Sequence, residues 1–162
     1  WLAMALADTL PLLHSSHPQR GEILAMFPSL MAAVARAQDD SGLWHQVLDQ
    51  PGREGNYLET SASAMFAYAL LKGLRLGYLV DSDPPGLGRA AAAAMEALAS
   101  QRVRLDGAGR FHLSGICKVA GLGGSPYRDG SFAYYVNEPV VADDYKGTGP
   151  YILALNESLM RK

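Results

Sequence analysis

The spacing of apolar residues restricts the folds that this chain can adopt more than any other sequence feature does. In five stretches they recur three and four positions apart, which places them on one face of an α-helix. Pro28 indicates a kink or a later start in the second stretch, and Asp83 caps the fourth, which begins at Pro84 or Pro85. The pattern predicts an all-α fold. We expect its helices over about 2–13, 23–34, 56–77, 84–102 and 143–162.

The connections between these helices alternate in length. Short polar turns join the first helix to the second and the third to the fourth, whereas residues 38–55 and 103–142 form long connections. Each long connection contains a glycine followed by an aromatic residue and a histidine, DDSGLWHQ at 39–46 and LDGAGRFHL at 105–113. This similarity between the two connections predicts a repeated helical hairpin. Stacked hairpins form a solenoid or a closed toroid, and in a toroid the long loops share one rim.

Composition and charge limit the partners. The 162 residues are 49% hydrophobic and 19% charged with a net charge of −2, which is typical of one folded domain. Basic residues form no run, which excludes nucleic acid as a partner. Residues 1–13 are apolar but contain Asp8 and are too short to cross a bilayer, so we expect no membrane partner. The single cysteine, Cys117, fits a reducing compartment, and we expect a cytoplasmic protein.

The rim loops contain the candidate binding residues. Trp44 and His45 in the first loop, and Phe111 and His112 in the second, precede helix N-termini, whose unpaired N–H groups suit a carboxylate or another polar ligand. The second loop continues through 119–139, a stretch rich in glycine and tyrosine. Aromatic faces beside hydrogen-bonding groups suit sugar rings.

These candidates also have purely structural interpretations. Trp44 is equally explained by packing in the core, and His45 and His112 by structural hydrogen bonds. Asp143 and Asp144 either cap the last helix or form a paired acid and base, which would need a closed pocket.

Three other chemistries lack a supporting pattern. His14 and His17 have no third ligand nearby, so we expect no metal site. The stretch GLGGSP at 121–126 matches neither glycine-rich phosphate-binding pattern, which excludes nucleotide binding. Cys117 has no nucleophile signature around it and is expected to be inert.

Two long motifs carry a resemblance to a known family. GLWHQVLDQPGREGNYLETSASAMFAYALLKGLRLGYL at 42–79 and CKVAGLGGSPYRDGSFAYYVNEPVVADDYKGTGPYILA at 117–154 resemble the unsaturated rhamnogalacturonyl hydrolases of glycoside hydrolase family 105, which is related to family 88. Residues 1–6 are similar to the continuation of the family's R-G-N-G-W segment, with Trp1 as its last residue. The resemblance implies an (α/α)6 barrel, of which residues 1–162 form a single partial domain of about five helices.

The resemblance also implies a chemistry. The family removes a 4,5-unsaturated galacturonic acid from rhamnogalacturonan fragments in pectin degradation, using an aspartate as general acid and base to hydrate an enol ether double bond. No metal or organic cofactor is implied. Because the matching aspartate and arginine would precede Trp1, the catalytic residue is unknown in this chain. We expect the chain alone to be inactive, and to self-associate through the open half of its barrel.

Six residues are expected to bind substrate, an unsaturated rhamnogalacturonan disaccharide or oligosaccharide. The resemblance supplies Trp1, as an aromatic wall, and the expected rim geometry supplies the other five. Glu59 could equally bond a loop backbone. The competing interpretation is a non-catalytic α-hairpin module that binds a carbohydrate or a protein. The six residues are Trp1, Trp44, His45, Tyr57, Glu59 and Lys146.

Overall fold

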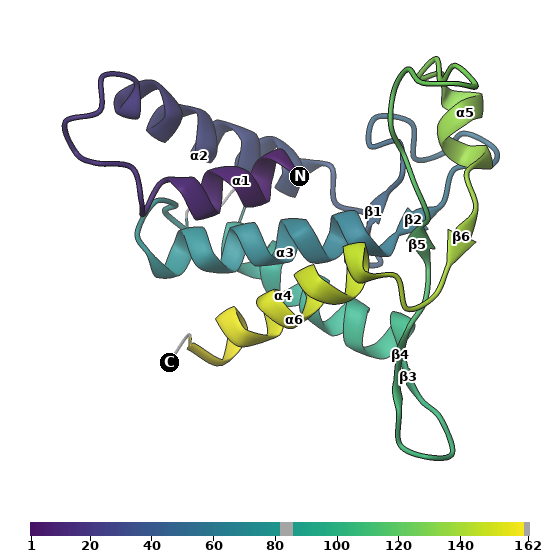
Figure 1. The fold of residues 1–162 in the computed structure, drawn as a ribbon. Helices are drawn as coiled ribbons and strands as arrows, with labels where there is room; N and C mark the ends of the chain where they lie inside the picture. The colour runs from purple at the N-terminus through teal and green to yellow at the C-terminus, as the bar shows by residue number, and fades with distance from the viewer. Residues whose placement is uncertain (82–85, 161–162) are drawn as a thin grey trace.

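The computed structural model describes residues 1–81 and 86–160, and helix α3 (Thr60–Arg75) lies at its centre. Helices α1 (Leu2–Thr9) and α6 (Tyr145–Met160) contact it, and helices α2 (Arg20–Arg36) and α4 (Leu87–Ala97) pack against it as well (Figure 1). The fold is therefore mainly helical, as the apolar spacing predicts. No helix within the described residues is long and apolar enough to cross a membrane.

The core forms where these five helices meet. The apolar spacing of each helix produces one buried stripe, and burying a large apolar side chain contributes roughly 1.5–3 kcal/mol. Trp44 and Leu43, from the first long connection, extend this core beyond the helices. The largest fully buried apolar side chains are Leu10, Phe27, Met31, Leu43, Trp44, Leu70, Leu98, Leu113 and Ile116.

The ends of α1, α2 and α3 differ from the sequence prediction, and α1 ends at Thr9 rather than near residue 13. Helix α3 begins at Thr60 rather than near 56, because the Glu59 side chain caps it by accepting hydrogen bonds from the Ser61 and Ala62 amides. Helix α2 begins at Arg20, and Pro28 lies inside it rather than at its start.

Helix α4 is confirmed, although its predicted start at Asp83, Pro84 or Pro85 lies outside the described residues. It passes at Leu98 into a π-helical turn that ends at Arg102, where the sequence predicts the helix end.

The long connections contain short elements that the sequence pattern does not predict. Within residues 1–81 and 86–160, three antiparallel pairs form, each of two strands. A six-residue helix, α5 (Phe132–Asn137), lies between β5 and β6. Strands this short are below the length at which a period of two can be recognised. The pairs are β1 (Trp44–His45) with β2 (Leu58–Glu59), β3 (Val103–Leu105) with β4 (Phe111–Leu113), and β5 (Ile116–Cys117) with β6 (Val140–Val141).

All three strand pairs lie at the same end of the helices, as expected for loops that share a rim (Figure 1). The segment from 118 to 139, which includes α5, projects from this end in one direction, and we call it the tower. The β3–β4 hairpin projects in another.

Candidate functional site

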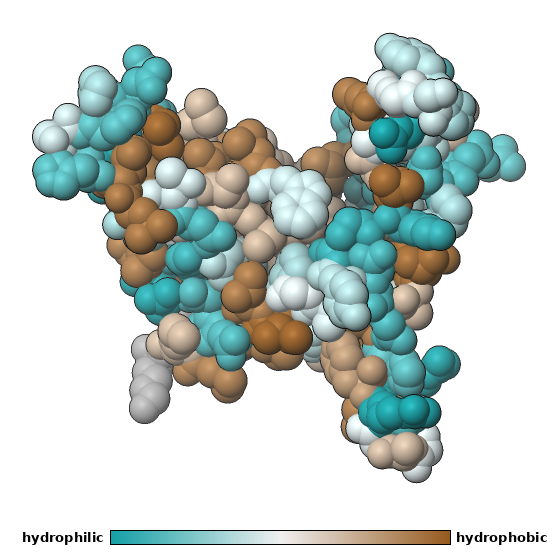
Figure 2. Space-filling view, viewed as in Figure 1, coloured by the Kyte–Doolittle hydropathy of each residue, from teal (hydrophilic) through white to brown (hydrophobic). Residues whose placement is uncertain are grey.

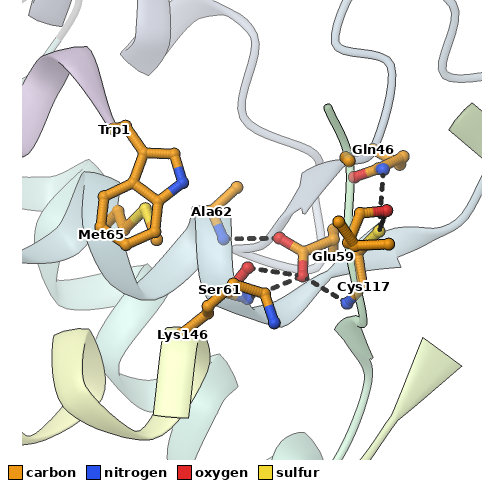
Figure 3. A pocket seen from close by; sticks show the side chains of 10 residues that line it. Trp1, Gln46, Glu59, Ser61, Ala62, Met65, Cys117 and Lys146 are labelled. Atoms are coloured by element: carbon orange, nitrogen blue, oxygen red, sulfur yellow. Dashed lines mark hydrogen bonds between the residues drawn. The ribbon is translucent and has the colours of Figure 1, made fainter. Parts of the chain in front are cut away.

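A pocket of about 250 Å³ opens where α1, α3 and α6 meet the strand pairs (Figure 3). Residues from five separate parts of the chain line it, so its shape depends on the tertiary fold. In Figure 3 the Trp1 ring lies beside Met65 on one side, and Gln46 and Cys117 lie on the other. The lining consists of Trp1, Gln46, Glu59, Ser61, Ala62, Met65, Cys117, Val119, Ala120 and Lys146.

Glu59 lies between these two sides and is 2% exposed. Its Oε1 accepts hydrogen bonds from the amide and hydroxyl of Ser61 at 3.0 and 2.8 Å, and from the Cys117 amide at 2.9 Å. Its Oε2 accepts one from the Ala62 amide at 2.5 Å. The N-terminus of α3 also favours a negative charge at this position. The Glu59 carboxylate therefore binds backbone amides, and its hydrogen bonds join β5 to the start of α3.

Lys146 reaches the pocket from the first turn of α6. Its Nζ donates to Asp144 Oδ1 at 2.6 Å, and its backbone amide donates to the same oxygen at 2.9 Å. These hydrogen bonds lower the pKa of Asp144. Asp144 thus caps α6 and holds Lys146, which leaves the Lys146 ammonium as the cation of the pocket lining within the described chain.

Asp143 takes part in a different contact. Its Oδ2 lies 2.7 Å from His112 Nδ1, and its Oδ1 accepts a hydrogen bond from the Leu113 amide at 2.8 Å. Neither Asp143 nor Asp144 lines the pocket, and the hydrogen bond from the Lys146 amide favours the cap interpretation of Asp144.

Trp1 presents an aromatic face to the pocket. Trp1 is 69% exposed, so a ligand can stack on its ring. Together with Lys146 it supplies an apolar face and a positive charge in one 250 Å³ space. A sugar ring with a carboxylate has the complementary pair of features.

Trp44 lies in the core and does not line the pocket. It is fully buried, its Nε1 donates to the Val34 carbonyl at 2.7 Å, and its ring packs edge-on against Phe66 at 5.3 Å between centroids. Its backbone amide donates to Ser63 Oγ at 3.0 Å. The structure therefore favours the packing interpretation of Trp44 over a role in the pocket wall.

His45 and Tyr57 also lie outside the pocket lining. His45 faces a separate hollow and lies 3.9 Å from the Asp39 carboxylate. The Tyr57 hydroxyl is buried without a hydrogen-bond partner among the described residues, and burial, with the Cys117 thiol and the Glu59 carboxylate nearby, raises its pKa.

Gln46 is a polar residue of the pocket that the sequence analysis does not single out. Gln46 Nε2 donates to Cys117 Sγ at 3.4 Å and to the Tyr135 carbonyl at 3.5 Å. Gln46 directly follows the Trp-His pair, yet glutamine is common in loops and nothing in its neighbourhood singles it out. No group of three or more His, Cys, Asp or Glu residues in the described ranges could hold a metal ion.

Comparisons with known proteins place the chain in a family. The sequence model described as Glycosyl Hydrolase Family 88 matches residues 1–162. Protein Atu3128 of Agrobacterium fabrum is 48% identical over 162 residues, which is 99% of this chain and 69% of that protein. The unsaturated rhamnogalacturonyl hydrolase YesR of Bacillus subtilis is 42% identical over 76 residues, 47% of this chain and 21% of that protein.

The fold has a match among solved structures. A family 105 glycoside hydrolase of C. acetobutylicum superposes with a TM-score of 0.88 and 44% identity, over 98% of this chain and 43% of that chain. The present chain thus spans less than half the length of that solved relative. Its helices correspond to part of the (α/α)6 barrel that the resemblance implies. The chain belongs to glycoside hydrolase family 88, and it is similar to members of family 105.

Proposed function

We propose that this chain is part of a glycoside hydrolase that removes the 4,5-unsaturated galacturonyl unit from rhamnogalacturonan fragments. The observation that carries the proposal is the pocket in which the Trp1 ring and the Lys146 ammonium face one ligand-sized space. The sequence similarity to a protein named as an unsaturated rhamnogalacturonyl hydrolase supports the choice of substrate. Residues 1–162 would form one partial barrel domain of the enzyme.

The proposed reaction is a hydration. A proton adds to C4 of the unsaturated ring and the oxygen of water adds to C5, which gives a hemiketal. The hemiketal opens, and the neighbouring sugar leaves from C1 with one water consumed overall. In this scheme Trp1 stacks on the unsaturated ring, and Lys146 binds its carboxylate by a charge-assisted hydrogen bond.

Glu59 is the one carboxylate among the described pocket residues, and both of its oxygens accept hydrogen bonds from the chain. A general acid must direct a proton to the substrate, whereas the two carboxylate oxygens of Glu59 are engaged by four hydrogen bonds that the chain itself donates. We therefore give Glu59 a positioning role, and propose that the acid comes from another part of the native protein.

The test uses the native protein that contains these residues and an unsaturated rhamnogalacturonan disaccharide. We expect the ultraviolet absorption of the conjugated alkene to disappear as the neighbouring sugar is released, with deuterium entering at C4 in D₂O. Release of a sugar with the alkene intact would contradict hydration. Binding without turnover would favour the non-catalytic module instead.

Lys146→Ala is expected to raise KM for the disaccharide about tenfold or more, because a hydrogen bond to a charged group contributes about 1.5–3 kcal/mol. Lys146→Arg keeps the charge and should recover most of the affinity. The matched control is Arg110→Ala, which removes an exposed cation from the β3–β4 turn, away from the pocket lining. An unchanged KM in Lys146→Ala would rule out its role in carboxylate binding.

A further inference from the structure

Another cavity lies on the tower, and none of the residues that line it belongs to the central pocket. It has a volume of about 460 Å³, which is enough for a sugar ring. We call it the tower hollow. Its lining residues are Ser125, Pro126, Tyr127, Arg128, Tyr134 and Glu138.

The tower hollow holds side chains whose binding capacity is unused. Tyr127 is 79% exposed and presents its ring to solvent. Arg128 donates from Nε to the Gly123 carbonyl at 3.0 Å. Among the described residues, neither its remaining guanidinium nitrogens nor the Glu138 carboxylate has a hydrogen-bond or ion-pair partner. An aromatic face, a cation and an acceptor thus line one space.

The tower is braced, so these groups are held in position before a ligand arrives. The Gly121 amide donates to Tyr134 Oη at 3.1 Å, and Ser131 Oγ caps α5 by accepting from the Tyr134 amide at 3.1 Å. The Arg53 guanidinium lies 3.8 Å from the centre of the Phe132 ring, which fixes α5 to the first long connection. Preorganisation of this kind lowers the entropic cost of binding.

The tower hollow and the central pocket are lined in part by one continuous loop. Val119 and Ala120 line the central pocket, and the same loop continues directly to the residues of the hollow. Burial raises the pKa of the Tyr57 phenol, and Cys117 of the central pocket and Glu138 of the hollow are both near enough to add to this effect. This continuity motivates the hypothesis that a chain of sugars leaving the pocket along this loop reaches the hollow.

We propose that the tower hollow is a distal subsite for a saturated sugar of an acidic oligosaccharide whose unsaturated end occupies the central pocket. The proposal rests on the proposed function for the identity of that oligosaccharide. Tyr127 stacks on the apolar face of the sugar, Arg128 binds a carboxylate, and Glu138 accepts hydrogen bonds from hydroxyl groups. The weakly polar surface of the tower in Figure 2 suits such a ligand better than an apolar partner.

The subsite predicts that affinity depends on substrate length. In the native protein, Tyr127→Ala should raise KM about three- to tenfold for an unsaturated rhamnogalacturonan tetrasaccharide, the range expected from losing an aromatic stacking contact. KM for the unsaturated disaccharide should not change, because the disaccharide ends before the hollow. Tyr127→Phe keeps the ring and should behave as the wild type.

Tyr145→Ala is the matched control, since it removes a tyrosine that is 90% exposed and lines neither cavity. It should leave KM for both substrates unchanged. An equal rise of KM for the disaccharide and the tetrasaccharide in Tyr127→Ala would overturn the subsite, because the tower would then only support the pocket. Unchanged KM values for both would overturn it too.

A binding measurement separates this proposal from the proposed function. A saturated rhamnogalacturonan tetrasaccharide cannot be hydrated, and its binding is followed by NMR titration of the native protein. If the disaccharide is not hydrolysed but Tyr127→Ala weakens this binding at least threefold, the function fails and the subsite stands. If the disaccharide is hydrolysed and the saturated tetrasaccharide binds wild type and Tyr127→Ala equally or not at all, the subsite fails alone.

Discussion

At the scale of single residues, Gly42 is a position where substitution by another amino acid is strongly disfavoured. It lies in the turn before Trp44 with a φ of +89°, a conformation that side chains rarely adopt. A Cβ at this position would lie 2.6 Å from the Ala93 carbonyl oxygen, which belongs to the backbone of α4. The glycine that opens the repeated sequence stretch is therefore required for the close approach of the turn to α4.

Gly42→Ala is expected to lower the free energy of unfolding by about 3 kcal/mol or more, because it combines a left-handed conformation with a clash against backbone. Gly77→Ala is the matched control. Gly77 has a φ of +74° with nothing within 4 Å of an added Cβ, so only the conformational cost of about 1–2 kcal/mol applies. Urea unfolding measures both, and equal losses would show that contact with α4 is unimportant.

At the level of elements, a charged contact joins the β3–β4 hairpin to the start of α6. His112 lies between Asp143 at 2.7 Å and Asp106 at 3.5 Å. Hydrogen bonds to the carboxylates of Asp143 and Asp106 raise the pKa of His112 above its usual 6.5. The same contact lowers the pKa of Asp143 below 3.8, and Arg104 adds to this effect.

The contact should stabilise the protein within a limited pH range. The His112 contribution is complete below pH 6.5 and is lost as the pH rises through the raised pKa of the folded state. The Asp143 contribution is complete above pH 3.8 and is lost as the pH falls through the lowered pKa. Both contributions are therefore present between about pH 4 and 6.5.

NMR titration of the imidazole tests this contact directly. In Asp143→Asn the pKa of His112 should fall towards 6.5, because the neutral amide no longer favours the imidazolium. Asp40→Asn, which changes an aspartate in the other long connection, serves as the control and should leave the titration unchanged. A His112 pKa that is the same in Asp143→Asn and in the wild type would contradict the contact in solution.

At the level of the whole molecule, the three helices α1, α3 and α6 are linked by ion pairs but leave apolar surface uncovered. Lys72 Nζ lies 2.6 Å from Asp8 Oδ1, and Arg75 binds both oxygens of Glu157 at 2.6 and 2.8 Å. Figure 2 shows apolar side chains, in brown, over the face that α1 and α6 present. Along α6, Ile152 is 51% and Leu159 75% exposed.

The isolated 162-residue chain should therefore self-associate, because large exposed apolar patches are covered by contacts between molecules. Light scattering after size-exclusion chromatography should give a mass above 17.3 kDa that rises with concentration. Ile152→Lys combined with Leu159→Lys should reduce the mass towards that of one chain. Leu12→Lys, at an 87% exposed position in a turn, should have no effect. A monomer at all concentrations would contradict the prediction.

Periodicity predicts the five long helices because each must bury one stripe of side chains. It predicts their ends less well. Helix α3 starts at Thr60 because Glu59, a residue type uncommon as a cap, folds its carboxylate back onto the first turn. The pairing of Trp44 with Glu59 across β1 and β2 depends on residues far apart in the sequence, so no local pattern contains it.

The candidate site is predicted only in outline. The rim position of the long loops follows from the hairpin repeat, and Trp1, Glu59 and Lys146 do line one pocket. Trp44 and His45 are adjacent in sequence to Gln46, yet only Gln46 lines it. Which of three neighbouring side chains faces a pocket is decided by the direction of a short strand, and two-residue strands leave no periodic signal.

The anchoring of α3 at both ends has a consequence for evolution. Glu59 fixes its N-terminal end to β5, and Arg75 fixes its C-terminal end to α6. The floor of the pocket therefore belongs to a part of the molecule that opens rarely, whereas the tower can gain, lose or exchange residues without displacing that floor. Relatives with the same barrel could thus acquire preferences for different oligosaccharides by drift in one loop alone.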